Sequence, residues 1–163
     1  MAFCSLQFAV CVLRFAFFYV FRFAPYAPHP PMTRVLIVDD QPAFRRQLRR
    51  LLTHAGLTVV GEAGSVAQAE TLALALQPDL AVMDVMLPGI SGIAGTRRLR
   101  AVAPDLRVIV VSAHRDRADL FQTAAQEAGA EAFVAKDDLD VSLAREWAET
   151  TPEPRTRQEG GTP

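Results

Sequence analysis

The chain has 163 residues, half of them hydrophobic and 21% charged, with a formal net charge of −1. This length suits one globular domain with a short appendage, and the balanced charge gives no basic excess of the kind that indicates nucleic-acid binding. The two cysteines, Cys4 and Cys11, match no zinc or redox spacing, and no disulfide framework is visible. A body without cysteine favours the cytosol, and we expect a cytoplasmic protein.

Residues 1–31 form an apolar leader that ends in a proline-rich stretch from residue 25. Arg14 and Arg22 interrupt the apolar run, which a membrane anchor would need to keep unbroken for about 20 residues. The start of the chain is not basic, as a secretory signal would require. We favour an over-extended gene start, with the functional domain beginning at Met32; a membrane-associated segment and a disordered extension are the alternatives.

Residues 32–150 alternate between strand-like apolar runs and helix-like stretches, and form the predicted domain. The predicted strands are 35–38, 58–61, 80–83, 108–112 and 132–134; the predicted helices are 42–55, 65–76, 92–102, 118–128 and 139–148. The first helix has Phe44, Leu48, Leu51 and Leu52 on one face at helical spacing. Four arginines, Arg45, Arg46, Arg49 and Arg50, point outward. Residues 151–163 contain three prolines and two glycines and should be disordered.

This alternation predicts an α/β fold: a doubly wound, five-stranded parallel sheet with helices on both faces. Strands without apolar–polar alternation agree, because parallel strands are buried on both sides. In the flavodoxin-like strand order 2-1-3-4-5, the first and third strands are neighbours at the switch point, where ligands bind beyond the carboxyl ends.

Five polar residues end strands at this predicted rim. Asp39 and Asp40 follow the first strand, Asp84 the third, Ser112 ends the fourth, and Lys136, the only lysine in the chain, follows the fifth. Three carboxylates together repel one another, and a hard divalent cation such as Mg²⁺ resolves the repulsion. An aspartate can act as a nucleophile toward phosphorus, and a lysine and a hydroxyl can then contact the phosphoryl oxygens.

Four sequence blocks resemble the receiver domain of bacterial two-component response regulators: VLIVDD at 35–40, DVMLPGISG at 84–92, VVSA at 110–113 and FVAK at 133–136. The resemblance covers about residues 33 to 148. It implies a signalling switch, not a conventional enzyme, in which a histidine kinase or phosphotransfer protein phosphorylates Asp84. It also implies that Mg²⁺ is bound by Asp39, Asp40, Asp84 and the backbone carbonyl of Met86.

The resemblance assigns further roles around that site. Ser112 and Phe133 match the switch pair of the family, which alters the face formed by the fourth helix, fifth strand and fifth helix. That face would then contact a downstream protein partner. Met86 and His114 stand where the family sets the lifetime of the phosphoryl group. The arginines of the first helix are interpreted as a solvated face, with kinase docking as the sharper alternative.

Two departures from the family pattern affect these expectations. Asp137 stands where the family commonly has a proline in a cis peptide. The block VVGEA at 59–63 resembles the subgroup that carries a helix-turn-helix output domain, yet no such domain follows in this sequence. We therefore expect a stand-alone receiver without direct DNA binding, and homodimerisation stays open.

Two other functions compete with the switch. The first is a truncated or degenerate transcriptional regulator that binds partners without phosphorylation, which the complete set of Asp40, Asp84, Ser112 and Lys136 disfavours. The second is a phosphohydrolase with an aspartyl-phosphate intermediate. That enzyme would need an acidic residue two positions after the nucleophile, where this chain has Met86.

Overall fold

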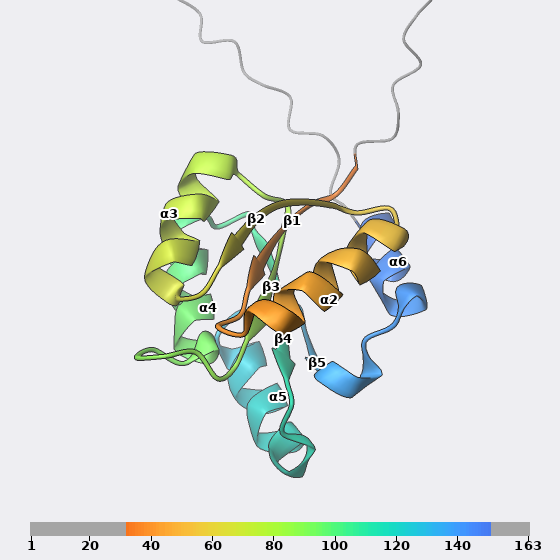
Figure 1. The fold of residues 1–163 in the computed structure, drawn as a ribbon. Coiled ribbons are helices and arrows are strands. Elements are labelled where there is room, and N and C mark those ends of the chain that lie inside the picture. Colours follow the sequence, from red (N-terminus) through yellow and green to blue (C-terminus); the bar gives the residue numbers. More distant parts are fainter. Residues whose placement is uncertain (1–31, 151–163) are drawn as a thin grey trace, which may run out of the picture. The chain divides into compact units, whose positions relative to one another are not determined.

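The computed structural model describes residues 32–150, so the leader and tail expected from the sequence lie outside the described residues. Five parallel strands form one sheet with the order β2-β1-β3-β4-β5 (Figure 1). The strands are β1 (Arg34–Val38), β2 (Thr58–Ala63), β3 (Leu80–Asp84), β4 (Arg107–Ser112) and β5 (Ala132–Ala135). The predicted α/β class and strand order are confirmed.

Five helices connect and follow these strands, and their numbering begins at α2, as in Figure 1. They are α2 (Pro42–His54), α3 (Val66–Leu76), α4 (Gly92–Val102), α5 (Ala118–Glu127) and α6 (Val141–Glu149). Side chains of α3, α4 and α5 share one buried cluster with the sheet, and those of α2 and α6 share another. The sheet is therefore the middle of three layers, as Figure 1 shows.

The helices begin where the sequence provides side-chain caps. Ser65, Ser91 and Asp140 each accept a hydrogen bond from a backbone N–H in the first turn of α3, α4 and α6, respectively. Such caps satisfy one of the unpaired N–H groups at a helix start. The central strands are apolar except at their ends because both of their faces are covered, and every residue of β3, including Asp84, is buried.

The structure differs from the predicted elements mainly after β4 and β5. Two 3-10 turns, η1 (Arg115–Arg117) and η2 (Lys136–Asp138), lie there, and neither was predicted. The last helix begins at Val141, two residues later than expected, because η2 and the capping residue Asp140 occupy the preceding positions. Within residues 32–150, no helix is long and apolar enough to cross a membrane.

The register of the sheet brings the predicted strand-end residues to one rim. Val38 pairs with Met83, so the residues that follow β1 lie beside the end of β3. Asp84 pairs with Val111, and Ser112 pairs with Ala135. The carboxyl ends of β1, β3, β4 and β5 are thus level with one another.

Candidate functional site

Asp39 and Asp84 are held by the same kind of turn at the ends of neighbouring strands. Asp39 Oδ1 accepts a hydrogen bond from the backbone N–H of Gln41 at 2.8 Å, and Asp84 Oδ2 accepts one from Met86 at 3.0 Å. An aspartate that accepts from the N–H two residues ahead fixes its own side chain and the start of the turn. One oxygen of each carboxylate is thereby held by a backbone N–H, and the other oxygen is available to a second partner.

That second partner is Lys136 in both cases. Its Nζ lies 2.6 Å from Asp39 Oδ2 and 3.0 Å from Asp84 Oδ1. The side chains are deeply buried: 10% exposed for Lys136, 1% for Asp39 and 3% for Asp84. The structure therefore brings these three predicted site residues into one contact set, although Lys136 is 97 residues from Asp39 in the chain.

The electrostatics of this set act most strongly on Asp84. Burial raises the pKa of the Asp84 carboxyl above its ordinary value of 3.8, and the charge of Asp39 raises it further. The Lys136 ammonium and the Met86 N–H oppose this shift without cancelling it. Two carboxylates and one ammonium leave one negative charge in excess, which a buried site stabilises poorly.

Ser112 and Phe133, the predicted switch pair, lie on β4 and β5. Ser112 is fully buried, and its hydroxyl oxygen accepts a hydrogen bond from the backbone N–H of His114 at 3.1 Å. Phe133 is partly buried against the cluster under α3, α4 and α5, with its ring centroid 6.4 Å from that of Phe121. Their switching role stays a prediction.

The two predicted modulators flank this rim. Met86 is 56% exposed, and the side chain of His114 is also exposed. Each follows a strand-end residue by two positions, and each donates its backbone N–H to that residue's side chain. Their backbones therefore contact the site directly, and their role in setting the lifetime of the phosphoryl group stays a prediction.

The predicted metal ligands fit Mg²⁺ in donor type, because carboxylate and carbonyl oxygens are the ligands that this ion prefers. The buried carboxylates of Asp39 and Asp84 both contact the ammonium of Lys136, whereas Asp40 is exposed. Within residues 32–150, no three acidic, histidine or cysteine side chains gather closely enough to hold a metal ion. The assignment of Asp39, Asp40, Asp84 and the Met86 carbonyl as ligands stays a prediction.

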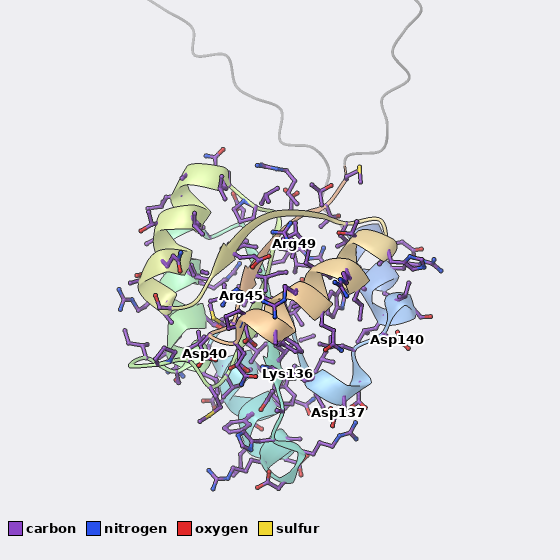
Figure 2. All side chains as sticks on the ribbon, viewed as in Figure 1. Asp40, Arg45, Arg49, Lys136, Asp137 and Asp140 are labelled. Carbon is purple, nitrogen blue, oxygen red and sulfur yellow. The ribbon has the colours of Figure 1, made fainter. Side chains whose placement is uncertain are left out.

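Arg45 is a site neighbour that the sequence pattern placed only on an outward face. Its Nη1 donates to the backbone carbonyl of Asp39 at 2.6 Å, and its Nε donates to Glu62 at 3.1 Å. Arg49, one turn later, contacts the same Glu62 carboxylate at 2.6 Å. Figure 2 shows Asp40, Arg45 and Lys136 around the first turn of α2, with Arg49 on the next turn. The interpretation of a purely solvated face is wrong for Arg45, whose side chain is only 19% exposed.

Phe44 is the second residue that sequence reasoning did not assign to the site. Helical periodicity placed it correctly on the apolar face of α2, and it packs at the edge of the core there. Its ring also lies under the Lys136 ammonium, with 4.1 Å between Nζ and the ring centroid. The local sequence gives no sign of this contact, because Phe44 and Lys136 meet only when α2 has packed against the sheet.

Comparison with known proteins gives a consistent result. Residues 35–144 match the sequence family described as the response regulator receiver domain. The chain is 43% identical over 115 residues to the DNA-binding transcriptional activator DevR/DosR of Mycobacterium tuberculosis; this covers 70% of the chain and 52% of that relative. The chain spans about half the length of the curated relatives it matches.

Solved structures with the same arrangement include the signal receiver domain of the putative response regulator NarL from Mycobacterium tuberculosis. It has a TM-score of 0.65 and 32% identity, over 72% of this chain and 94% of that one. A response regulator from Burkholderia pseudomallei has a TM-score of 0.63 and 25% identity, over 72% and 67% of the respective chains. That structure contains a phosphorylated aspartic acid, a calcium ion and citrate.

Proposed function

The chain belongs to the response regulator receiver domain family, and from this membership we propose that it is a phosphorylation-dependent switch whose phosphoacceptor is Asp84. Receiver domains serve two-component signalling as phosphoacceptors, not as conventional enzymes, and their partner is a histidine kinase. We propose that a histidine kinase or a phosphotransfer protein supplies the phosphoryl group to this chain in the cytoplasm.

The observation that carries the proposal is the position of Lys136 between two buried carboxylates. Its ammonium contacts Asp39 at 2.6 Å and Asp84 at 3.0 Å. A lysine that only stabilised the fold would be satisfied by one carboxylate, and a second buried one would cost free energy. A site that must receive a phosphoryl group, by contrast, needs both a nucleophilic oxygen and a cation beside it.

In the proposed reaction, an oxygen of ionised Asp84 attacks the phosphorus atom of the donor. A bond forms between that oxygen and phosphorus, and the bond from phosphorus to the leaving group breaks, with its electron pair going to the leaving group. Lys136 neutralises charge on the phosphoryl oxygens, since its ammonium already lies 3.0 Å from Asp84 Oδ1. The Met86 N–H holds the other oxygen of Asp84.

Mg²⁺ fits the same proposal as the ion that completes the charge balance. The ligands would be Asp39, Asp40, Asp84 and the Met86 carbonyl, and the bound ion supplies neutralisation of the phosphate charge. The excess negative charge beside Lys136 supports this requirement. In the relative from Burkholderia pseudomallei, a phosphorylated aspartate and a calcium ion occur in one structure.

Output is proposed to pass through Ser112 and Phe133 to the face formed by α5, β5 and α6. Ser112 ends β4 and is buried, so its hydroxyl can respond to charge at the rim. Leu120 on α5 is 71% exposed and offers an apolar side chain for contact with a downstream protein. Alternatively, a second copy of this chain would bind the same face and form a homodimer.

Phosphoryl transfer from a small donor tests the proposal directly. The full chain is mixed with Mg²⁺ and acetyl phosphate, and its intact mass is followed. We expect a gain of one phosphoryl group that hydroxylamine removes, as it does from an acyl phosphate, and that a chelator prevents.

Two variants make the result specific. Asp84→Asn should abolish the mass gain, because an amide has no nucleophilic carboxylate oxygen. Asp119→Asn, at an exposed position on α5, is the matched control and should be labelled like the unaltered chain. Labelling that persists in Asp84→Asn, or no labelling of the unaltered chain, would contradict the proposal.

A further inference from the structure

We infer that Phe44 is a positioning residue for the phosphoryl site, and that its ring holds the Lys136 ammonium against Asp39 and Asp84. An ammonium group has three hydrogen-bond donors. Two sides of Nζ face carboxylate oxygens, Asp39 Oδ2 at 2.6 Å and Asp84 Oδ1 at 3.0 Å. A further side faces the Phe44 ring, whose centroid is 4.1 Å away.

A ring face at this distance attracts a cation, because the quadrupole of benzene places negative charge above and below the ring. The attraction is stronger where water is excluded, and the Lys136 side chain is only 10% exposed. An aliphatic side chain at position 44 could fill the same space but could not attract the ammonium. The aromatic ring is therefore more than packing material at this position.

Local structure places the ring and the carboxylate as one unit. The N–H of Gln41, the residue before α2, is bound to Asp39 Oδ1, and Pro42 starts the helix with its fixed backbone angle. Phe44 follows within the first turn of α2. Asp39 and the ring thus belong to one short segment of chain, and Lys136, the first residue of η2 after β5, contacts both.

The contact with the ring would restrict the flexible side chain of Lys136. A free lysine side chain has four rotatable bonds and loses considerable conformational entropy when it is fixed. A ring that holds the ammonium before the phosphoryl donor arrives removes that loss from the transfer step, which is the advantage of preorganisation. This role rests on the proposed function of Asp84 as phosphoacceptor.

The single lysine of the chain makes the contact measurable. Protein grown with ¹³C-labelled lysine gives one set of side-chain NMR signals, and the ring current of Phe44 should shift the ε-methylene protons of Lys136 upfield. We compare Phe44→Leu, which removes the ring, with Phe44→Tyr, which keeps it. The shift should disappear in Phe44→Leu and persist in Phe44→Tyr.

The same variants are then labelled with acetyl phosphate and Mg²⁺. We expect Phe44→Leu to slow phosphoryl uptake by roughly five- to thirty-fold, the range that corresponds to loss of a largely desolvated cation–π contact, and Phe44→Tyr to restore it. A merely structural role would change thermal stability in both variants without this pattern. If Phe44→Leu does not fold, a ring-fluorinated phenylalanine inserted at position 44 keeps the shape and weakens the quadrupole.

Two results would overturn the inference: an unchanged lysine shift in Phe44→Leu, or a lost shift with an unchanged rate of uptake. Failure of the proposed function appears on a different signal, because the unaltered chain would then take up no phosphoryl group at all. The NMR comparison and the labelling of the unaltered chain thus separate the two failures.

Discussion

At the scale of single residues, the site is defined by a charge imbalance that the fold retains. Asp39 and Asp84 are both buried, and they share one ammonium. Burial raises the pKa of Asp84 in spite of Lys136, so the ionised site costs free energy in the absence of another cation. A buried charge that lowers the free energy of unfolding is typical of functional sites, where activity is retained at some cost in stability.

The raised pKa of Asp84 gives a prediction about stability and pH. The folded state binds the Asp84 proton more tightly than the unfolded state, so the free energy of unfolding falls as pH rises from 3.8 through the raised pKa. Asp84→Asn removes this loss, and we expect it to be more stable than the unaltered chain at neutral pH. The difference should shrink as the solution is acidified below the raised pKa, because the unaltered chain then also has a neutral side chain.

Urea unfolding of both proteins at several pH values, without divalent cations, checks this expectation. Asp119→Asn serves again as the control for the loss of one exposed carboxylate. A lower stability of Asp84→Asn at neutral pH would show that the Lys136 contact outweighs burial.

At the scale of elements, the site depends on how closely α4 approaches the end of β3. The N–H of Gly92, the first residue of α4, donates to the Val85 carbonyl at 2.9 Å. A Cβ atom at position 92 would lie only 1.8 Å from the Asp84 carbonyl oxygen, which is far inside van der Waals contact. Only glycine lets the helix start on the backbone of the proposed phosphoacceptor.

Gly92→Ala should therefore displace α4 or the Asp84 turn. We expect a loss of about 3 kcal/mol or more in the free energy of unfolding, at the upper end of the range for overpacking, together with slower phosphoryl uptake. Gly89→Ala is the matched control: Gly89 has a φ of 81° and no atom within 4 Å of an added Cβ. That substitution should cost only about 1–2 kcal/mol, from backbone strain alone. Equal losses in the two variants, measured by urea unfolding, would refute the steric explanation.

The loops after β4 and β5 are joined by surface charges. The guanidinium of Arg115, in η1, pairs with Asp137 and Asp138 in η2. All three side chains are more than half exposed, so these pairs contribute little to stability. They do connect the loop that follows Ser112 with the turn that contains Lys136, and Asp137 occupies the position where the family commonly has proline.

At the scale of the whole domain, the proposed site lies at one edge of the sheet, and different helices cover the two faces of that sheet. α3, α4 and α5 pack on one face, and α2 and α6 on the other. β5 is an edge strand whose four residues are all partly exposed. A change at the rim that moves Ser112 and Phe133 would therefore reach solvent first through α5 and β5.

Hydrogen exchange measures this response. Beryllium fluoride with Mg²⁺, used as a mimic of the phosphoryl group, should change amide exchange in the loop after β4, in α5 and in β5. The buried strand β1 should show little change, because none of its residues belongs to the switch pair. Asp84→Asn should abolish the effect, and identical exchange with and without the mimic would contradict a switch at this face.

Much of this arrangement follows from the sequence, for identifiable reasons. Apolar runs without alternation reveal buried parallel strands, and the positions of Asp39, Asp84, Ser112 and Lys136 at strand ends place them at one rim once the strand order is inferred. What the sequence did not reveal depends on tertiary packing. The 3-10 turns after β4 and β5 leave no periodic signal, and the contact between Phe44 and Lys136 exists only between packed elements.

The position of the modified residue tests most directly whether Asp84 is the phosphoacceptor. The chain is phosphorylated with acetyl phosphate and Mg²⁺, reduced with borohydride, digested, and analysed by peptide mass spectrometry. Reduction converts an aspartyl phosphate to homoserine, so we predict homoserine at position 84 and aspartate at positions 39 and 40. Homoserine at another aspartate, or none anywhere in a chain that has gained phosphate, would contradict the account.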